Sequence, residues 1–372
     1  MIKQLINEDS YVQIGDLCSA TIQLKIEGLN PAGSIKLKTA HALITDLEVR
    51  GLINHKTRLI ESSSGNLGVA LAMVCAAKGY QFVCVIDPNI SAPNRKLIQA
   101  LGAQMLMVDQ RDENGGYLNS RIRLIEQLVA DNADYIWLNQ YKNPTNPLAH
   151  YQATARSIAR KFPQVDYLFV GAGTTGTLMG CKNYFAEHHP QTKVIAVDTV
   201  GSVTFGLPGG TRHIPGLGTS RLPEIFESSG IYDFLSIPEE QTIKVCRWLA
   251  QRYGLLFGGS TGTVLAGIRQ WAPHIRPDDV VVAISPDMGE RYLETIYSDD
   301  WVTQRIGATA LQPSSLKSLW HSRRNPHDHT ESDPAVPRDP QRCRQRHPQR
   351  AAACNHRHGG ADLPDPRAWR NR

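Results

Sequence analysis

Hydrophobic and polar positions follow two periods that alternate along this chain up to about residue 305. Short apolar runs of period two indicate strands, and longer segments with apolar residues at helical spacing indicate helices. The predicted strands are residues 22–26, 57–61, 81–86, 104–108, 135–138, 167–170, 193–197 and 279–284. The predicted helices are residues 37–52, 67–78, 93–101, 118–131, 150–161, a segment through Tyr184, 241–253 and 263–271.

Strands and helices that alternate at this spacing predict the α/β class, in which helices cover parallel sheets. We expect two doubly wound parallel-sheet lobes, one over residues 1–145 and one over residues 146–309. An alternative for the first strands is that they pack on the C-terminal lobe. A cleft between two such lobes is the expected ligand site.

The composition changes from Leu311 onward. Eight prolines, eleven arginines and six histidines stand in these 62 residues, with little apolar periodicity. Such a segment buries too little surface to offset the entropy of ordering, so residues 310–372 are predicted to be a disordered basic tail. A nucleic-acid-binding arm is the alternative, but few aromatic residues lie among the basic ones. A further alternative is that this C-terminal segment has no function.

The net charge of +5 comes from this tail, which holds 12 of the 40 Lys and Arg residues and 6 of the 35 Asp and Glu residues. The rest of the chain is nearly neutral, and we expect no nucleic-acid partner. The seven cysteines are scattered without metal-type spacing, so we expect neither a metal site nor a disulfide framework. No apolar run approaches the roughly 20 residues of a membrane span. These features predict a soluble, cytoplasmic protein.

The first candidate site is the turn from Gly28 to Lys36, which leads into a predicted helix. Ser34 stands where a helix N-cap is expected, and Lys36 lies in the first turn. The positive end of a helix disfavours a protonated lysine and lowers its pKa. A deprotonated amine can attack an aldehyde to form a Schiff base. A solvated lysine at a helix start is the alternative.

Three further loops each stand before a predicted helix. Residues 61–68 combine serines and glycines with Asn66, which suits a carboxylate. In residues 171–177, Gly171, Gly173 and Gly176 match the dinucleotide pattern, with Asp198 some twenty residues later. The alternative for this loop is a cup for one phosphate, formed by three threonine hydroxyls and main-chain amides. In residues 257–262, Ser260 offers a neutral hydrogen bond to a heterocycle nitrogen.

Pyridoxal 5′-phosphate is the cofactor that suits these four candidate sites together. It needs a lysine that can form a Schiff base, a loop that binds an anion, a cup for its phosphate and a neutral partner for its ring nitrogen. The chain resembles the fold-type II family of cysteine synthase, cystathionine β-synthase and the tryptophan synthase β subunit. The family's N-P-x-x-S-x-K matches Asn30 to Lys36, and its T-S-G-N-T-G resembles Ser63 to Gly68. Further matches are Gly173 to Thr177, Gly258 to Gly262, His150-Tyr151 and Gly289 to Leu293.

The resemblance implies a role for each of these residues. Lys36 would hold the cofactor and move the α-proton, Asn66 would bond the ring hydroxyl and Ser260 the pyridine nitrogen. The phosphate would lie against Gly173, Thr174, Thr175, Gly176 and Thr177. The substrate carboxylate would bind Ser63, Ser64, Gly65 and Asn66, with Gln140. A neutral serine at the ring nitrogen favours β-elimination followed by addition of a nucleophile.

Several stretches resemble a narrower branch, the N-(2-amino-2-carboxyethyl)-L-glutamate synthases of 2,3-diaminopropionate biosynthesis. These enzymes are transferases that join O-phospho-L-serine to the amine of L-glutamate, for siderophores or nonribosomal peptides. The stretches are Gly115 to Arg121, Asn139 to Tyr141, Thr174 to Thr177, Gly201 to Gly206, Ile214 to Ile225 and Ser285 to Asp287. A phosphate leaving group and a dicarboxylate nucleophile need extra donors, for which Arg121 and Tyr141 are the candidates and Arg221 a weaker one.

Two other hypotheses stay open. The chain is a cysteine synthase that uses O-acetylserine or O-phosphoserine with sulfide, or it is a binding protein that keeps the fold without catalysis. Intact Lys36, Asn66 and Ser260 argue against the second of these. The resemblance also implies a homodimer.

Overall fold

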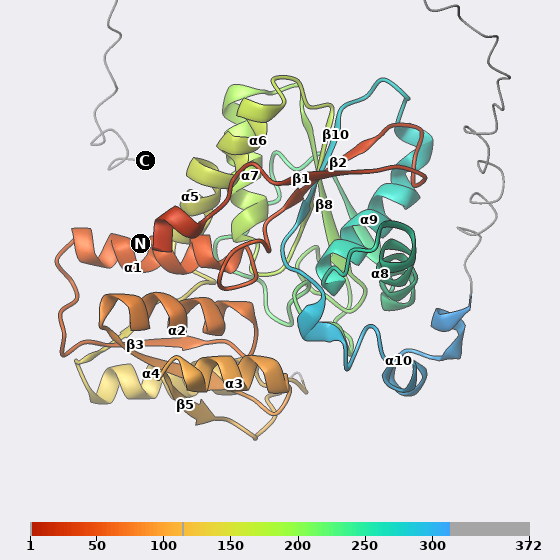
Figure 1. Ribbon diagram of the computed structural model, residues 1–372. Coiled ribbons are helices and arrows are strands. Elements are labelled where there is room, and N and C mark those ends of the chain that lie inside the picture. Colours follow the sequence, from red (N-terminus) through yellow and green to blue (C-terminus); the bar gives the residue numbers. More distant parts are fainter. Residues whose placement is uncertain (1, 114, 313–372) are drawn as a thin grey trace, which may run out of the picture. The chain divides into compact units, whose positions relative to one another are not determined.

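The structure, a computed structural model, describes residues 2–113 and 115–312 (Figure 1). Both of its sheets lie in one compact unit. The predicted tail from residue 313 onward lies outside the described residues. The 3₁₀ helix η5 (Ala308–Leu311) includes the first two residues of the predicted tail.

The smaller sheet has four parallel strands in the order β5-β4-β3-β6. They are β5 (Gln104–Met107), β4 (Gln81–Ile86), β3 (Arg58–Ser62) and β6 (Tyr135–Trp137). Alternate residues of β3 and β4 face opposite sides. On one side Leu59 and Phe82 pack with α1 (Lys36–Val49), α2 (Asn66–Lys78) and α3 (Ala92–Ala100). On the other side Ile60 and Val83 pack with α4 (Leu118–Asp131).

The larger sheet has six strands in the order β1-β2-β10-β7-β8-β9. They are β1 (Tyr11–Ile14), β2 (Ile22–Ile26), β10 (Val281–Ser285), β7 (Tyr167–Gly171), β8 (Lys193–Thr199) and β9 (Asp233–Ile237). Only the β1–β2 pair is antiparallel in this sheet. The first two strands therefore pack in the sheet of the C-terminal half, while the domain boundary at residue 145 stays a prediction.

Helices cover both faces of the larger sheet as well. Ile195 and Val197 of β8 pack in one core with α8 (Glu239–Tyr253) and α9 (Gly259–Trp271). Val194 and Ala196 pack in another core with α6 (Arg156–Lys161) and α7 (Gly176–His188). The predicted α/β class with two parallel-sheet lobes is confirmed.

The long helix predicted over residues 150–161 has three parts in the structure. These are α5 (Thr145–His150), the π-helical segment η2 (Tyr151–Ala155) and α6. After β10 in the chain come the 3₁₀ helix η4 (Glu290–Tyr292) and α10 (Asp299–Arg305). Residues of these two helices and of η5 pack in one small hydrophobic core. The short helices η1 (Ile2–Leu5) and η3 (Ala272–His274) complete the described elements. Within the described residues, no helix has the length and apolar character needed to cross a membrane.

Candidate active site

Lys36 is the first residue of α1 and extends toward the loop that precedes α7. Its Nζ donates a hydrogen bond to Thr174 Oγ1 at 3.3 Å. Burial lowers the pKa of Lys36 to about 8, and the negative charge of Glu61 opposes this shift. The predicted direction is therefore confirmed, but its main cause is burial. The expectation that Ser34 caps the helix is wrong, because Ile35 holds the N-cap position and the buried Ser34 Oγ has no partner in the described part of the chain.

The loop between β7 and α7 is held in place by its main chain. The amide of Ala172 donates to Val197 O at 2.8 Å, and the amide of Gly218 donates to Ala172 O at 2.8 Å. A Cβ atom at Gly173 would lie 2.6 Å from Gly216 O, so only glycine fits there. These contacts bring the loop close to the Gly216 segment.

Three threonine hydroxyls lie in this loop and in the first turn of α7, into which it leads. Thr175 adopts a left-handed conformation with φ 66°, which is uncommon for a β-branched residue. Its Oγ1 is buried and has no partner within residues 2–113 and 115–312. The amides in the first turn of α7 have no acceptor inside the helix. The loop is thus suited to bind an anion.

Asn66 begins α2, and residues from the far end of the chain hold its side chain. Its Nδ2 donates to Asp287 Oδ2 at 2.8 Å, and Arg291 Nη1 donates to its Oδ1 at 3.0 Å. Tyr292 also donates its hydroxyl to Asp287 Oδ2. Burial raises the pKa of the Asp287 carboxyl, and these donors oppose the shift. Both ends of the Asn66 amide are therefore engaged, and its proposed bond to a ring hydroxyl stays a prediction.

Ser260 lies in the first turn of α9, which begins four residues earlier than the sequence predicted. Its side chain is buried against the Gly216 segment, where a Cβ atom on Gly216 would lie 2.3 Å from Ser260 Oγ. Gly216 thus contacts both Ser260 and the loop at Gly173. The structure brings the predicted ring-nitrogen partner and the predicted phosphate loop to the same segment.

The loop before α2 is braced by its own serines. Ser63 Oγ accepts hydrogen bonds from the amides of Gly65 and Gly68, at 3.3 and 3.0 Å. Ser64 Oγ accepts from the amide of Asp87 at 3.0 Å and from Arg121 Nη1 at 3.2 Å. Of the predicted carboxylate ligands, both serines thus have roles within the fold, and their binding roles stay predictions.

Glu61 fixes the position of Gln140 beside this loop. Its Oε2 accepts from the amide of Gln140 at 3.1 Å, and Gln140 Nε2 donates to Ser62 O at 3.2 Å. Burial raises the pKa of the Glu61 carboxyl to about 7, and hydrogen bonds from the main chain oppose this shift. No role was predicted for Glu61, although it directly precedes the serines.

Arg121 of α4 reaches the same loop with a side chain that is only 11% exposed. Its Nη1 lies 3.2 Å from Asp87 Oδ2, and its Nε is buried without a partner in the described part of the chain. Burial raises the pKa of Tyr141, and the positive charge of Arg121 opposes that shift. Arg221, the weaker candidate, pairs with Glu224 and lines an open surface pocket with Asn119 and Arg123.

A family model described as "pyridoxal-phosphate dependent enzyme" matches residues 11–287. The chain belongs to this family. Many solved structures resemble it, among them the following three. O-ureido-L-serine synthase is 29% identical, with a TM-score of 0.73 over 86% of this chain and 98% of that one. A hydrogen-sulfide-producing enzyme from Fusobacterium nucleatum is 30% identical, with a TM-score of 0.73 over 79% and 99% of the two chains.

The third structure is an O-acetylserine-dependent cystathionine β-synthase from Helicobacter pylori. It is 28% identical, with a TM-score of 0.74 over 80% of this chain and 98% of that one. The predictions of a fold-type II enzyme and of pyridoxal phosphate as its cofactor are confirmed. For residues 171–177 the family favours the phosphate cup over the dinucleotide alternative, and the cup itself stays a prediction. The non-catalytic hypothesis is not supported, because the family consists of enzymes.

The residues present fit the cofactor of this family. In the part of the chain that the structure describes, the buried hydroxyl of Thr175 lacks a partner, and the amides in the first turn of α7 have no acceptor inside the helix. Lys36 donates to the neighbouring Thr174. A phosphate is the group that would satisfy these donors together. Within residues 2–113 and 115–312, no cluster of three or more His, Cys, Asp or Glu residues is arranged to hold a metal ion.

Proposed function

We propose that this enzyme catalyses a β-replacement that joins O-phospho-L-serine to the amine of L-glutamate. The product would be N-(2-amino-2-carboxyethyl)-L-glutamate, with release of phosphate, in 2,3-diaminopropionate biosynthesis. The observation that carries this proposal is the position of Arg121, whose guanidinium lies against Ser64 and has a buried Nε that lacks a partner among the described residues. A guanidinium with a free donor suits a phosphate or a second carboxylate, whereas acetate and sulfide need no such group.

The residues of the site have distinct tasks in this proposal. When bound, pyridoxal phosphate supplies an electron sink that stabilises negative charge at the substrate α-carbon. Lys36 removes the α-proton, for which an amine with a pKa of about 8 is well matched near neutral pH. The loop at Ser63 and Ser64 orients the substrate carboxylate with Gln140, which Glu61 holds in place. Ser260 offers the ring nitrogen a neutral hydrogen bond.

Cysteine synthesis from O-acetylserine and sulfide is the second candidate. It is supported by the similarity to the Helicobacter pylori enzyme, which is named as O-acetylserine-dependent, and to the hydrogen-sulfide-producing enzyme. For either activity we propose that the enzyme is a cytoplasmic homodimer, by resemblance to the family. Light scattering would measure the mass of the dimer.

Mass spectrometry after incubation with O-phospho-L-serine and L-glutamate tests the proposal, with O-acetyl-L-serine and sulfide as the comparison pair. We expect a glutamate-linked product that is absent with Lys36→Ala. Arg121→Gln is expected to lower kcat/KM for O-phosphoserine by about 10- to 100-fold, the effect of losing a hydrogen bond to a charged group.

Arg123→Gln is the matched control, because Arg123 lies on the same helix and pairs with Glu113 at an exposed position. It should leave both reactions unchanged. Formation of cysteine alone, with no glutamate-linked product, would reject the proposed substrates in favour of the second candidate. Equal kcat/KM values for Arg121→Gln and Arg123→Gln would reject the role of Arg121.

A further inference from the structure

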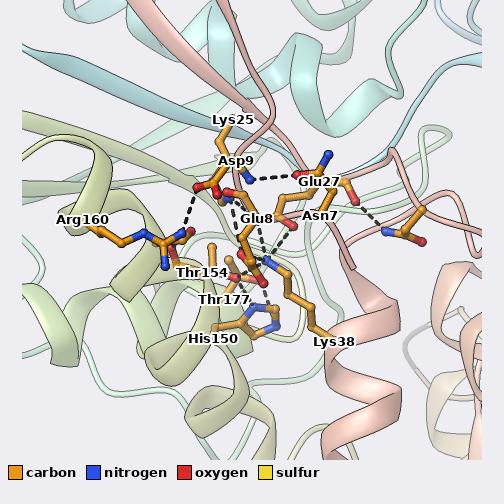
Figure 2. Close-up of polar contacts among 12 residues, drawn as sticks. Asn7, Glu8, Asp9, Lys25, Glu27, Lys38, His150, Thr154, Arg160 and Thr177 are labelled. Carbon is orange, nitrogen blue, oxygen red and sulfur yellow. Dashed lines mark hydrogen bonds and ion pairs between the residues drawn. The ribbon is translucent and has the colours of Figure 1, made fainter. Parts of the chain in front are cut away.

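His150 is a fully buried residue that the proposed reaction does not use. It ends α5, immediately before the π-helical segment η2. Helix α7 packs very closely here, since a Cβ atom on Gly180 would lie 2.7 Å from His150 Cβ. Figure 2 shows the imidazole beside Thr154 and Thr177, with Lys38 close by.

Both ring nitrogens of His150 face threonine hydroxyls. Nδ1 lies 3.1 Å from Thr154 Oγ1. Nε2 lies 3.0 Å from Thr39 Oγ1 and 3.4 Å from Oγ1 of Thr177, which belongs to the predicted phosphate cup. Since a neutral imidazole carries one proton, its tautomer decides which of these hydroxyls donate and which accept.

Lys38 favours one direction for the hydrogen bond at Nδ1. Its Nζ donates to Thr154 Oγ1 at 3.2 Å, as Figure 2 shows, and an ammonium group can only donate. Thr154 therefore accepts from Lys38 and has its own proton available for Nδ1. This arrangement favours Nδ1 as the acceptor, although a hydroxyl oxygen can accept two hydrogen bonds, so the contact with Lys38 does not fix the tautomer alone.

Thr39 leads to the same tautomer from the other side. Asn146 Nδ2 donates to Gln140 O at 2.8 Å, which turns its Oδ1 toward Thr39. Thr39 donates its hydroxyl to this oxygen at 3.3 Å. The Thr39 oxygen is then left to accept a proton from Nε2.

We propose that His150 is a positioning residue whose Nε2 proton, shared between Thr39 at 3.0 Å and Thr177 at 3.4 Å, keeps the Thr177 hydroxyl from donating to the ring and so leaves the Thr177 proton free for the cofactor phosphate. In the opposite tautomer, with the proton on Nδ1, Thr177 would donate its hydroxyl to Nε2 and would present an oxygen lone pair to the phosphate. Burial and the charges of Lys38 and Lys36 lower the pKa of His150 well below its usual range, so the ring is neutral. Asn146 acts on Thr174 in the same way: its Nδ2 donates to Thr174 Oγ1 at 3.4 Å, so Thr174 accepts this hydrogen bond.

This inference concerns the cofactor rather than the substrates, so the identity of the substrates does not affect it. The test measures the dissociation constant of pyridoxal phosphate for the apoprotein by fluorescence titration. His150→Asn keeps an amide only near the position of Nδ1, whereas His150→Gln keeps an N–H group near the position of Nε2. We expect His150→Asn to weaken binding about tenfold and His150→Gln to stay within about threefold of the wild type.

A double-mutant cycle separates positioning from a general structural effect. Thr177→Val should also weaken binding about tenfold, and the His150→Asn/Thr177→Val pair should lose little more than either single variant. Thr192→Val is the matched control, because it removes a buried hydroxyl that donates to Val165 O at 2.7 Å away from this loop. It should lower the melting temperature without weakening cofactor binding.

The ring tautomer itself is measured by nitrogen-15 NMR of the wild-type apoprotein, with the His150 signal assigned from its loss in His150→Gln. A proton on Nε2 supports the proposal, and a proton on Nδ1 overturns it. Additive losses in the double-mutant cycle would also overturn it, as would an unchanged dissociation constant for His150→Asn. The NMR measurement decides the question even if His150→Asn does not fold.

Discussion

Burial moves the pKa values of Lys36 and Glu61 toward neutrality from opposite sides. The amine falls to about 8, and the carboxyl rises to about 7. In each case desolvation of the charged form is the largest cause. Both groups therefore change protonation within the range in which an enzyme of this family would work.

The pKa of Lys36 predicts how the apoprotein takes up its cofactor. Only the neutral amine can react with the aldehyde, so the rate of covalent uptake should fall about tenfold for each pH unit below 8 and level off above it. Stopped-flow absorbance of apoprotein mixed with pyridoxal phosphate measures this rate. An analogue with a methyl group in place of the aldehyde should bind without this pH dependence. A midpoint near the ordinary lysine value would contradict the burial argument.

Individual site residues were predictable where they form a local pattern. Lys36, Thr174 and Ser260 each stand in a short motif before a helix, and the structure brings all three motifs together. Their supporting residues were not predictable, because hydrogen-bond partners far apart in sequence leave no periodic signal. Asn66 is held by Asp287, which lies 221 residues later. The motifs that begin at Ser285 and Gly289 were recognised in the sequence, but no function was predicted for their residues.

Helices were predicted well where the apolar period is long and unbroken. The helix over residues 118–131 has the predicted bounds, and the helix over residues 67–78 is extended by one residue. Strands β1 and β9 were missed because each is short and exposed in part. The π-helical segment was missed because one turn of wider winding does not disturb the apolar spacing visibly.

The close packing of α7 on α5 allows an element-scale prediction. Alanine favours helices over glycine by about 1 kcal/mol, so propensity alone predicts that Gly180→Ala stabilises the enzyme. The new Cβ atom, however, would lie 2.4 Å from Pro147 O, which is main chain and cannot move aside freely. We expect Gly180→Ala to reduce the free energy of unfolding by about 1–3 kcal/mol and to weaken cofactor binding, because it displaces the helix that carries the phosphate cup.

Urea denaturation and cofactor titration measure these two effects. Gly15→Ala is the control, since its Cβ atom would meet only the Tyr253 hydroxyl at an ordinary 3.8 Å. It should change neither quantity appreciably. An increase in stability for Gly180→Ala would mean that helix propensity outweighs the contact and that α7 can shift away from α5 without loss.

At the scale of the whole molecule, a buried cluster of charges connects parts that are distant in sequence. Lys25 of β2 and Lys38 of α1 share the carboxylates of Glu27 and Glu8, as Figure 2 shows. The side chains of Lys25, Glu27 and Lys38 are at most 4% exposed. The cluster thus links the N-terminal segment and the larger sheet to the helix that begins with Lys36.

Glu27 is the central acid of this cluster, and its removal should be far more costly than that of an exposed partner. Glu27→Gln leaves two buried ammonium groups with only Glu8, so we expect the free energy of unfolding to fall by about 3–5 kcal/mol. Asp46→Asn is the control, because it breaks an exposed pair with Arg50 at 3.0 Å that contributes about 0.5 kcal/mol or less. Urea denaturation at neutral pH measures both. Lys25→Met in the Glu27→Gln background should restore part of the loss by removing one of the unpaired charges. Equal stabilities for Glu27→Gln and Asp46→Asn would show that water or Glu8 alone compensates the two lysines.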